Sequence, residues 1–162
     1  MITEKILLVS YWFGTHILLF AFRSFLLWRD TGINPVVFEK KDDAHDFNGQ
    51  VFRFVFVLSF FTIALYAFGG KWYEYLLPIW YLEAPYLKII GWALMIIPIP
   101  FVFLAQLQMS DSWRIGIDKK NETDLSETGL FRWSRNPIYL GIFVAHLGFF
   151  LVLPNALTLL YV

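Results

Sequence analysis

The chain has 162 residues, of which 58% are hydrophobic and 20% aromatic, and its 13 basic residues balance 13 acidic ones. Soluble domains average about 45–50% apolar residues, so this composition favours a membrane protein. The even charge balance argues against a nucleic-acid-binding protein, which would present a basic surface. The absence of cysteine excludes structural disulfides and thiolate metal sites, and we expect no metal site.

Four stretches of the chain contain no charged residue, and they set the expected architecture. They are residues 6–22, 54–70, 89–110 and 136–162. A membrane-spanning helix needs about 20 apolar residues. The last two stretches reach this length, and the first two reach it if Arg23 and Arg53 extend their charged ends to the membrane surface. We therefore expect an all-α polytopic membrane protein with about five transmembrane helices, forming a single domain over residues 1–162.

The first two expected helices are separated by a polar connection. The first helix covers about residues 4–28, and the second covers about residues 50–68, where Gly69 and Gly70 end it. The next stretch, residues 71–86, contains six Trp and Tyr side chains, two prolines and few charges. Aromatic residues at this density are typical of a membrane–water interface.

Prolines mark the later helices. The third helix is expected over about residues 86–109, with a bend at Pro98 and Pro100. The fourth begins at Pro137, because proline in a first helical turn has no N–H to leave unsatisfied. Pro154 and Asn155 predict a turn, after which a fifth helix starts. Because its few residues cannot span a membrane, we expect this helix to be truncated and the C-terminal part of the domain to be missing.

Lys and Arg residues predict the orientation in a bacterial inner membrane. The first and third loops share one side, and the second loop and the N-terminus share the other. The first side holds Arg29, Lys40, Lys41, Arg53, Arg114, Lys119, Lys120, Arg132 and Arg135, whereas the second holds Lys5, Lys71 and Lys88. Loops on the cytoplasmic side carry an excess of Lys and Arg, so we expect loops one and three in the cytoplasm.

The stretch "GLFRWSRNPIYLG", residues 129–141, places Arg132 and Arg135 directly before the fourth helix. A helix N-terminus offers free N–H groups and a partial positive charge. Together with Arg135, it can bind a carboxylate or a phosphate. A simpler interpretation also fits, in which the two arginines anchor the helix at the membrane surface and Tyr139 is an interfacial aromatic residue.

This stretch resembles the signature of the isoprenylcysteine carboxyl methyltransferase family and, more loosely, of the phospholipid methyltransferases. In that pattern Arg-His-Pro-x-Tyr-x-Gly begins a membrane helix, and here it reads Arg-Asn-Pro-Ile-Tyr-Leu-Gly over residues 135–141. The upstream segments "SWRIGID" and "TDLSETG" look like bacterial members of the same group. The resemblance implies a membrane enzyme that transfers a methyl group from S-adenosylmethionine to a lipophilic small molecule or lipid, at a carboxylate or an amine.

The same resemblance implies which residues form the site. The expected cofactor contacts are Thr123, Asp124, Leu125, Ser126, Phe131, Asn136, Pro137, Ile138 and Tyr139. Gly141 is expected to leave room for close approach of the cofactor. Arg114 and Arg135 are the candidate catalytic residues, which would orient an anionic substrate head. Because positioning dominates methyl transfer, the sequence needs no catalytic histidine at this place.

The sequence departs from the family pattern at two points. Asn136 replaces the usual histidine, and an asparagine cannot titrate near neutral pH, so a proton acceptor is not expected there. The paired glutamates that follow the fifth helix in the family are also absent. Within the expected spans, we expect His16 and His146 to form hydrogen bonds across helices and Arg23 to reach towards the membrane surface.

Two other functions are compatible with the same pattern. A membrane reductase of the sterol-reductase type has a related helix layout, and it predicts binding of NADPH in place of S-adenosylmethionine. A membrane scaffold without enzymatic activity predicts no cofactor binding and tolerance of changes at Tyr139. A cofactor-binding measurement separates the three.

Overall fold

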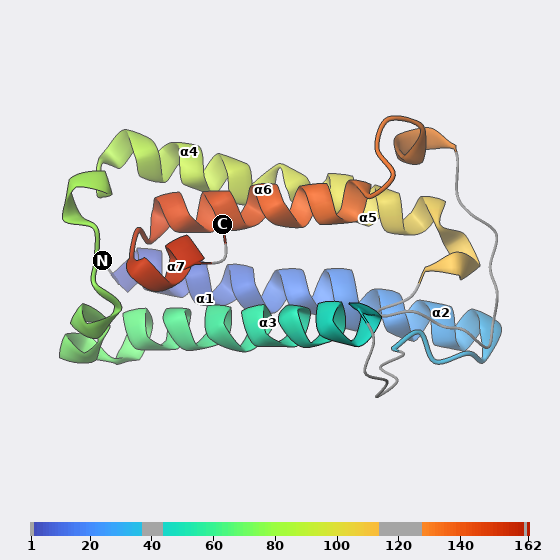
Figure 1. Cartoon of the computed structure of the whole chain (residues 1–162), viewed down its shortest axis with the longest axis horizontal. Coiled ribbons are helices and arrows are strands. Elements are labelled where there is room, and N and C mark those ends of the chain that lie inside the picture. The colour runs from blue at the N-terminus through green and yellow to red at the C-terminus, as the bar shows by residue number, and fades with distance from the viewer. Residues whose placement is uncertain (1, 37–43, 114–127, 161) are drawn as a thin grey trace.

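The computed structural model describes residues 2–36, 44–113, 128–160 and 162, and the regular elements in these residues are all helical. Four long helical rods run back and forth to form one bundle (Figure 1). The first rod consists of α1 (Ile2–His16), a π-helical turn (Ile17–Phe22) and α2 (Arg23–Thr31), joined without a break. Gly32 ends it in a left-handed conformation with φ of 71°. The expected first helix is confirmed, and it extends to Thr31.

The second rod is α3 (Ala44–Phe68), and it begins earlier than the expected residue 50. Its end at Phe68 is as predicted, and the N–H of Gly69 still donates to the Leu65 carbonyl over 2.8 Å. Two short 3₁₀ helices, Gly70–Leu76 and Trp80–Leu82, then lead to the third rod.

The third rod divides at Pro98, where the sequence predicted a bend. It consists of α4 (Pro85–Ile96) and α5 (Pro98–Gln108), which meet at Ile97. Pro98 has no backbone N–H to donate to the preceding turn, and its ring clashes with a carbonyl of that turn. The helix therefore divides there. Two 3₁₀ turns, Ser110–Ser112 and Gly129–Arg132, lie between this rod and the fourth.

The fourth rod is α6 (Pro137–Val152), and the short α7 (Ala156–Leu160) follows a turn at Asn155. Both predictions made from Pro137 and from the Pro-Asn pair are confirmed. Asn155 is fully buried, and its Oδ1 accepts the N–H groups of Leu157 and Thr158, each over 3.0 Å. This is the N-cap arrangement that satisfies the free donors of a helix start.

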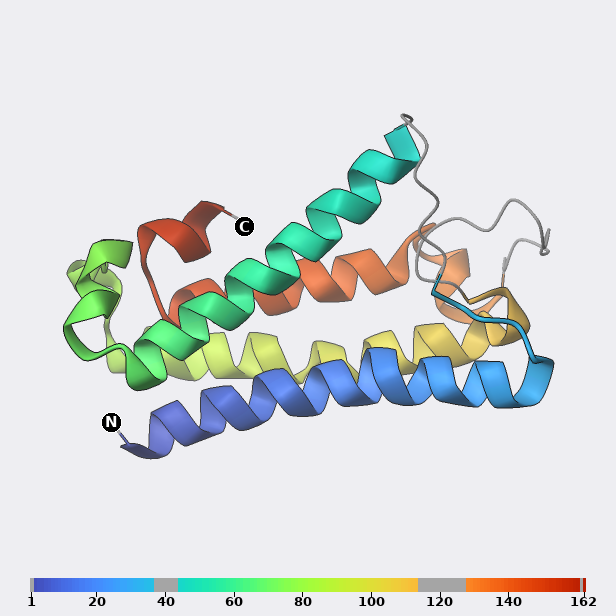
Figure 2. The ribbon, with the colours of Figure 1, turned by 90° about the horizontal axis from the view of Figure 1, so that it is seen from below.

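A tyrosine also holds this turn. The Asn155 Nδ2 donates to the Tyr73 hydroxyl over 3.4 Å, and the Ile79 N–H donates to the Pro154 carbonyl over 2.7 Å. Burial raises the pKa of the Tyr73 phenol to about 12, so the hydroxyl is neutral at ordinary pH. The turn directs α7 back along the bundle, against α3 and α6 (Figure 2).

Glycines bring the third and fourth rods into backbone contact. A Cβ atom on Gly91 of α4 would lie 2.8 Å from the Gly148 carbonyl of α6, and one on Gly148 would lie 2.6 Å from the Gly91 carbonyl. Gly141 packs in the same way, because a Cβ there would collide with the Val102 side chain of α5. Small residues that allow helix backbones to approach are typical of membrane helix packing.

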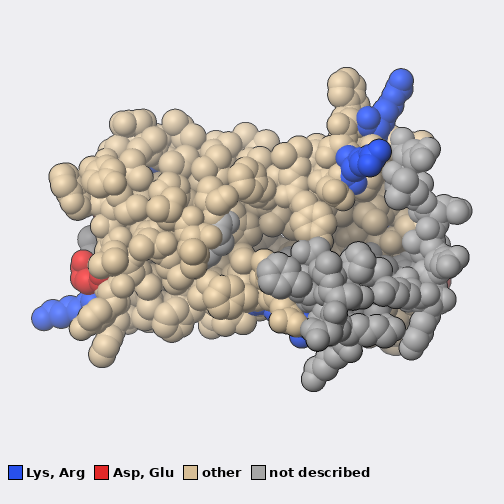
Figure 3. All heavy atoms as spheres, viewed as in Figure 1, with Lys and Arg blue, Asp and Glu red and all other residues tan. Residues whose placement is uncertain are grey.

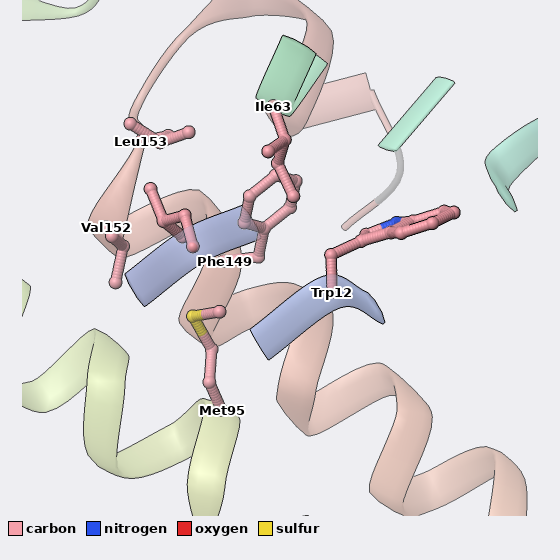
Figure 4. Close-up of a cluster of buried hydrophobic side chains, with 7 residues drawn as sticks. Trp12, Ile63, Met95, Phe149, Val152 and Leu153 are labelled. Carbon is pink, nitrogen blue, oxygen red and sulfur yellow. The ribbon is translucent and has the colours of Figure 1, made fainter. Parts of the chain in front are cut away.

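The dry core lies where all four rods meet. Trp12 of α1, Ile63 of α3, Met95 of α4 and Phe149 of α6 converge there (Figure 4). Each is at most 8% exposed. The close packing of these side chains fixes the relative positions of the rods.

Two helices in the described part of the chain are long and apolar enough to cross a membrane. They are the first rod, Ile2–Thr31, and the third, Pro85–Gln108. The apolar helices Arg53–Phe68 and Pro137–Val152 are shorter. The expected all-helical fold is therefore confirmed, whereas the length criterion is met by two helices and not by five. α3 does not meet the criterion because its first turns contain polar residues, and α7 does not meet it because it has only five residues.

Candidate functional site

Charged side chains divide the bundle into two ends. We call the end where α5 finishes and α6 begins the loop end, and the opposite end, with the two 3₁₀ helices after α3, the aromatic end. On the face in Figure 3, basic and acidic side chains lie near the two ends, and the surface between them is almost entirely uncharged. At the aromatic end, Glu4 pairs with Lys88 over 3.0 Å and accepts from the Tyr66 hydroxyl. The loop end holds Arg132 and Arg135, as predicted.

The start of α6 is the centre of the predicted site. Pro137 occupies the first turn and is fully buried, and Asn136 is the exposed N-cap residue. The Asn136 side chain makes no capping hydrogen bond, although its backbone N–H donates to the Ser134 Oγ over 3.2 Å. The helix dipole and the first N–H groups therefore face the loop end without a side-chain cap.

The predicted residues beside this helix start are accessible. Arg135 and Arg132 are exposed, and Tyr139 is 66% exposed. Ile138 and Phe131 are half-buried. The structure thus places Phe131, Arg135, Asn136, Pro137, Ile138 and Tyr139 within one short stretch at the loop end.

The first half of the motif is fastened to the end of α5. The Leu130 N–H donates to the Gln108 Oε1 over 2.7 Å. Gly129 has φ of 61° and packs so closely on Gln108 that a Cβ would lie 2.5 Å from its amide. A residue with a side chain is strained in this conformation, so the glycine holds the motif on α5.

Arg23 does not behave as the sequence suggested. We expected its side chain to reach the membrane surface, but it is only 6% exposed. Its Nη2 donates to the carbonyls of Gln106 over 3.3 Å and Ser110 over 2.7 Å, and its guanidinium lies 5.7 Å from the Trp113 ring centroid. These carbonyls lie at the C-terminal end of α5, where the helix dipole is negative and carbonyls lack helical partners, so a buried cation is stabilised there.

Sequence reasoning missed Gln106. Its side chain is fully buried, and its Nε2 donates to the Leu19 carbonyl over 2.7 Å. Leu19 lies in the π-helical turn, which His16 precedes and Arg23 follows. Isolated π turns are frequent at functional sites. The feature of the sequence that could have identified Gln106 is the presence of a glutamine in an otherwise apolar stretch.

The two histidines within the expected spans also differ from expectation. We expected hydrogen bonds across helices, but each ring binds its own helix. The Nδ1 of His16 lies 2.6 Å from the Trp12 carbonyl, and the Nδ1 of His146 lies 2.8 Å from the Ile142 carbonyl. The two imidazoles nevertheless lie close enough that a positive charge on His146 would disfavour one on His16.

Arg114, Thr123, Asp124, Leu125 and Ser126 lie outside the described residues. Gly141 was expected to leave room for the cofactor. The structure instead fills this space with Val102, so the glycine serves helix packing.

A family model described as "Protein of unknown function (DUF1295)" matches residues 39–162 of the chain. The chain belongs to the DUF1295 family. This family is grouped with the steroid 5α-reductases and related membrane proteins. The matched segment contains α3 to α7 and the complete motif before α6, so the loop end of the bundle belongs to the DUF1295 region except for α2. Comparison with the curated proteins and with the solved structures gave no match.

Proposed function

We propose that this DUF1295 protein is a membrane-embedded methyltransferase that uses S-adenosylmethionine and acts on a lipophilic acceptor. The observation that supports it most is the placement of the Arg-Asn-Pro-Ile-Tyr motif. It begins α6 at the loop end, where Asn136 leaves the helix N-terminus uncapped beside the exposed Arg135. A helix N-terminus and an arginine are together suited to a carboxylate.

The described residues fit the polar half of S-adenosylmethionine. Its carboxylate would face the N–H groups of the first turn of α6 and the guanidinium of Arg135. Phe131 and Tyr139 offer aromatic surface for the rest of the cofactor. The predicted cofactor contacts at residues 123–126, which lie outside the described residues, stay a prediction. When bound, S-adenosylmethionine supplies a methyl group already activated by its positive sulfur. The chain then has to orient the acceptor and exclude water, and such positioning can supply about 7–11 kcal/mol.

The surface of the bundle supports a membrane location. Large apolar side chains are exposed along every rod between the two ends: Phe13 and Ile17, Phe60 and Phe61, Ile96 and Ile97, Leu140 and Phe143. Soluble monomers rarely expose apolar patches beyond a few hundred Å². We infer that lipid covers this surface in a bacterial inner membrane, with the loop end in the cytoplasm as the Lys and Arg distribution predicts.

Trp and Tyr residues of the aromatic end are consistent with this placement. Trp72, Tyr75, Trp80, Tyr81 and Tyr86 are all at least 65% exposed. Aromatic rings that combine an apolar body with one polar group are favoured at the membrane–water boundary. The aromatic end would then lie at the outer boundary of the membrane.

A reductase that uses NADPH is the second candidate. It is favoured by one observation, the grouping of the DUF1295 family with the steroid 5α-reductases. The same helix N-terminus and exposed arginines would then face the phosphates of NADPH.

Cofactor titration decides between these functions. The natural protein is purified into lipid nanodiscs and titrated calorimetrically with S-adenosylmethionine and, separately, with NADPH; empty nanodiscs provide the blank. Saturable binding of S-adenosylmethionine alone supports the methyltransferase. Binding of NADPH alone replaces it with the reductase, and binding of neither favours the scaffold and rejects both enzymes.

A further inference from the structure

Polar side chains occupy the bundle directly next to its dry core. His16 lies one helical turn from Trp12 towards the loop end, and His146 lies one turn from Phe149 in the same direction (compare Figure 4 for the core residues). Ser59 of α3 is at this level too, since its Oγ accepts from the Trp12 Nε1 over 3.0 Å. An ionisable residue inside a membrane helix bundle is costly and marks a functional position by default.

Gln106 continues this polar region towards the loop end. Its bond to the Leu19 carbonyl places it about one helical turn beyond His16 along the first rod. Its Oε1 is buried and has no hydrogen-bond partner in the part of the chain that the structure describes. A buried polar atom without a partner is unfavourable, so an arrangement that leaves one needs an explanation.

The direction of each hydrogen bond defines what the region offers to a ligand. A carbonyl oxygen only accepts, so the Nδ1 of His16 carries the proton that it shares with the Trp12 carbonyl. In the neutral ring the Nε2 is then an acceptor, and no hydrogen bond of this nitrogen is found among the described residues. His146 shares its Nδ1 proton with Ile142 in the same way. The acceptors that the region presents are the Nε2 of His16 and the Oε1 of Gln106.

The neighbouring hydroxyl groups donate to backbone carbonyls. Ser59 donates to the Phe56 carbonyl, and Thr15 donates to carbonyls of its own helix. The Nη2 of Arg23, the nearby cation, donates to carbonyls at the end of α5. A head group that donates a hydrogen bond would therefore satisfy the acceptors Nε2 of His16 and Oε1 of Gln106.

We propose that this region, His16 with Gln106 and the neighbouring His146, binds the head group of a lipophilic molecule through a hydrogen bond that the head group donates. Its ligand class is a lipophilic phenol, alcohol, thiol or amine. Aromatic rings line the place: Trp12 lies 4.3 Å, Phe56 4.9 Å and Phe20 5.7 Å from the His16 ring, centroid to centroid. The identification of this ligand as the methyl acceptor rests on the proposed function.

The experiment compares three probes that share one tail. They are 4-hexylphenol, 4-hexylanisole and 4-hexylbenzoate, of which only the phenol donates a hydrogen bond. Each is titrated calorimetrically into the natural protein in nanodiscs, with empty nanodiscs as the blank. We expect the phenol to bind about tenfold tighter than the anisole, since a hydrogen bond to an otherwise unpaired buried acceptor is worth that much. The benzoate, which cannot donate a hydrogen bond either, should also bind more weakly than the phenol.

Matched variants test the residues. His16→Asn places an amide near the position of Nδ1 and removes the Nε2 acceptor, whereas His16→Gln can place an amide near Nε2. We expect His16→Asn to abolish the preference for phenol over anisole and His16→Gln to retain part of it. Gln106→Met should also reduce the preference. Thr15→Val is the control, because among the described residues the Thr15 hydroxyl bonds only to its own helix.

A spectroscopic measurement reports on the same atom without any cofactor. The chain has three histidines, so histidine-selective ¹⁵N labelling gives few signals, and His16→Asn assigns one of them. We expect an unprotonated Nε2 in the apo protein, shifted by 4-hexylphenol and unchanged by 4-hexylanisole. A protonated Nε2 or equal shifts with both probes overturns the proposal.

The two proposals can fail separately. Equal binding of phenol and anisole, tightest binding of the benzoate, or an unchanged preference in His16→Asn rejects the head-group site even if S-adenosylmethionine binds. A phenol preference that depends on His16, in a protein that does not bind S-adenosylmethionine, supports the site and rejects the methyltransferase.

Discussion

The Arg23 guanidinium donates to the Ser110 carbonyl over 2.7 Å, and so links residues 87 positions apart. Ser110 has φ of 47°, a left-handed conformation that a non-glycine residue rarely adopts. A helix commonly ends with such a residue, although glycine is usual there. The arginine thus stabilises the strained end of α5 and joins the first rod to the loop end.

Replacement of Arg23 tests this link. We predict that Arg23→Met lowers the stability of the bundle by about 1.5–3 kcal/mol, the value of hydrogen bonds to a charged group. Thermal unfolding in detergent, followed by circular dichroism, measures the change. Arg29→Met is the control, because Arg29 lies on the same helix, is exposed and pairs only with Asp30 among the described residues. Equal loss in both variants would contradict the buried role of Arg23.

The glycine contact between α4 and α6 yields a second prediction. Gly148→Ala should destabilise the bundle by about 1–3 kcal/mol, as overpacked positions do, because the new methyl group meets backbone atoms of α4. Gly14→Ala is the matched control in α1, where nothing lies within 4 Å of the added Cβ. Alanine favours a helix by up to about 1 kcal/mol over glycine, so this variant should be neutral or more stable. The same unfolding measurement ranks the two.

The motif before α6 gives a third prediction, which depends on the proposed function. In the natural protein, Arg135→Ala and Tyr139→Ala should each weaken S-adenosylmethionine binding by roughly 10- to 150-fold, the equivalent of one charge-assisted hydrogen bond. Arg132→Ala should change binding by less than about threefold, since exposed charges contribute little. Calorimetric titration in nanodiscs measures all three. A damaging Arg132→Ala with a silent Arg135→Ala would place the cofactor elsewhere.

The orientation in the membrane can be measured with single cysteines, since the chain has none. Arg132 at the loop end and Lys71 at the aromatic end are both exposed. We predict that Lys71→Cys reacts with an impermeant maleimide in intact cells, and that Arg132→Cys reacts only after the cells are opened. The reverse labelling pattern would put the loop end outside the cytoplasm.

The sequence predicted what local chemistry controls. Pro98 divides the third rod, Pro137 starts α6, and Asn155 begins the last turn, because each acts through its own backbone or its immediate neighbours. The extra length of α3 was not predicted, since its first turns contain polar residues that hydropathy does not identify as a helix.

Long-range contacts could not be predicted in this way. The direction of the Arg23 side chain depends on α5, which lies far along the chain. The role of Gly141 depends on Val102, and the burial of Gln106 depends on the π-helical turn of the first rod. In each case the same residue type would have a different role if another helix were its neighbour. Some residues of the candidate site could therefore be predicted from the sequence, whereas their arrangement in space could be obtained only from the structure.

The π-helical turn Ile17–Phe22 has a consequence for how related chains are compared. A π turn contains one residue more than an α turn, so a relative with an unbroken α-helix at this place would be one residue shorter. An alignment that places a single-residue gap within these apolar positions would then be structurally correct, although gaps inside helices are usually treated as errors. An alignment without this gap would match only one of the two positions, His16 or Arg23, with its structural equivalent in the relative. The other position would be displaced by one residue.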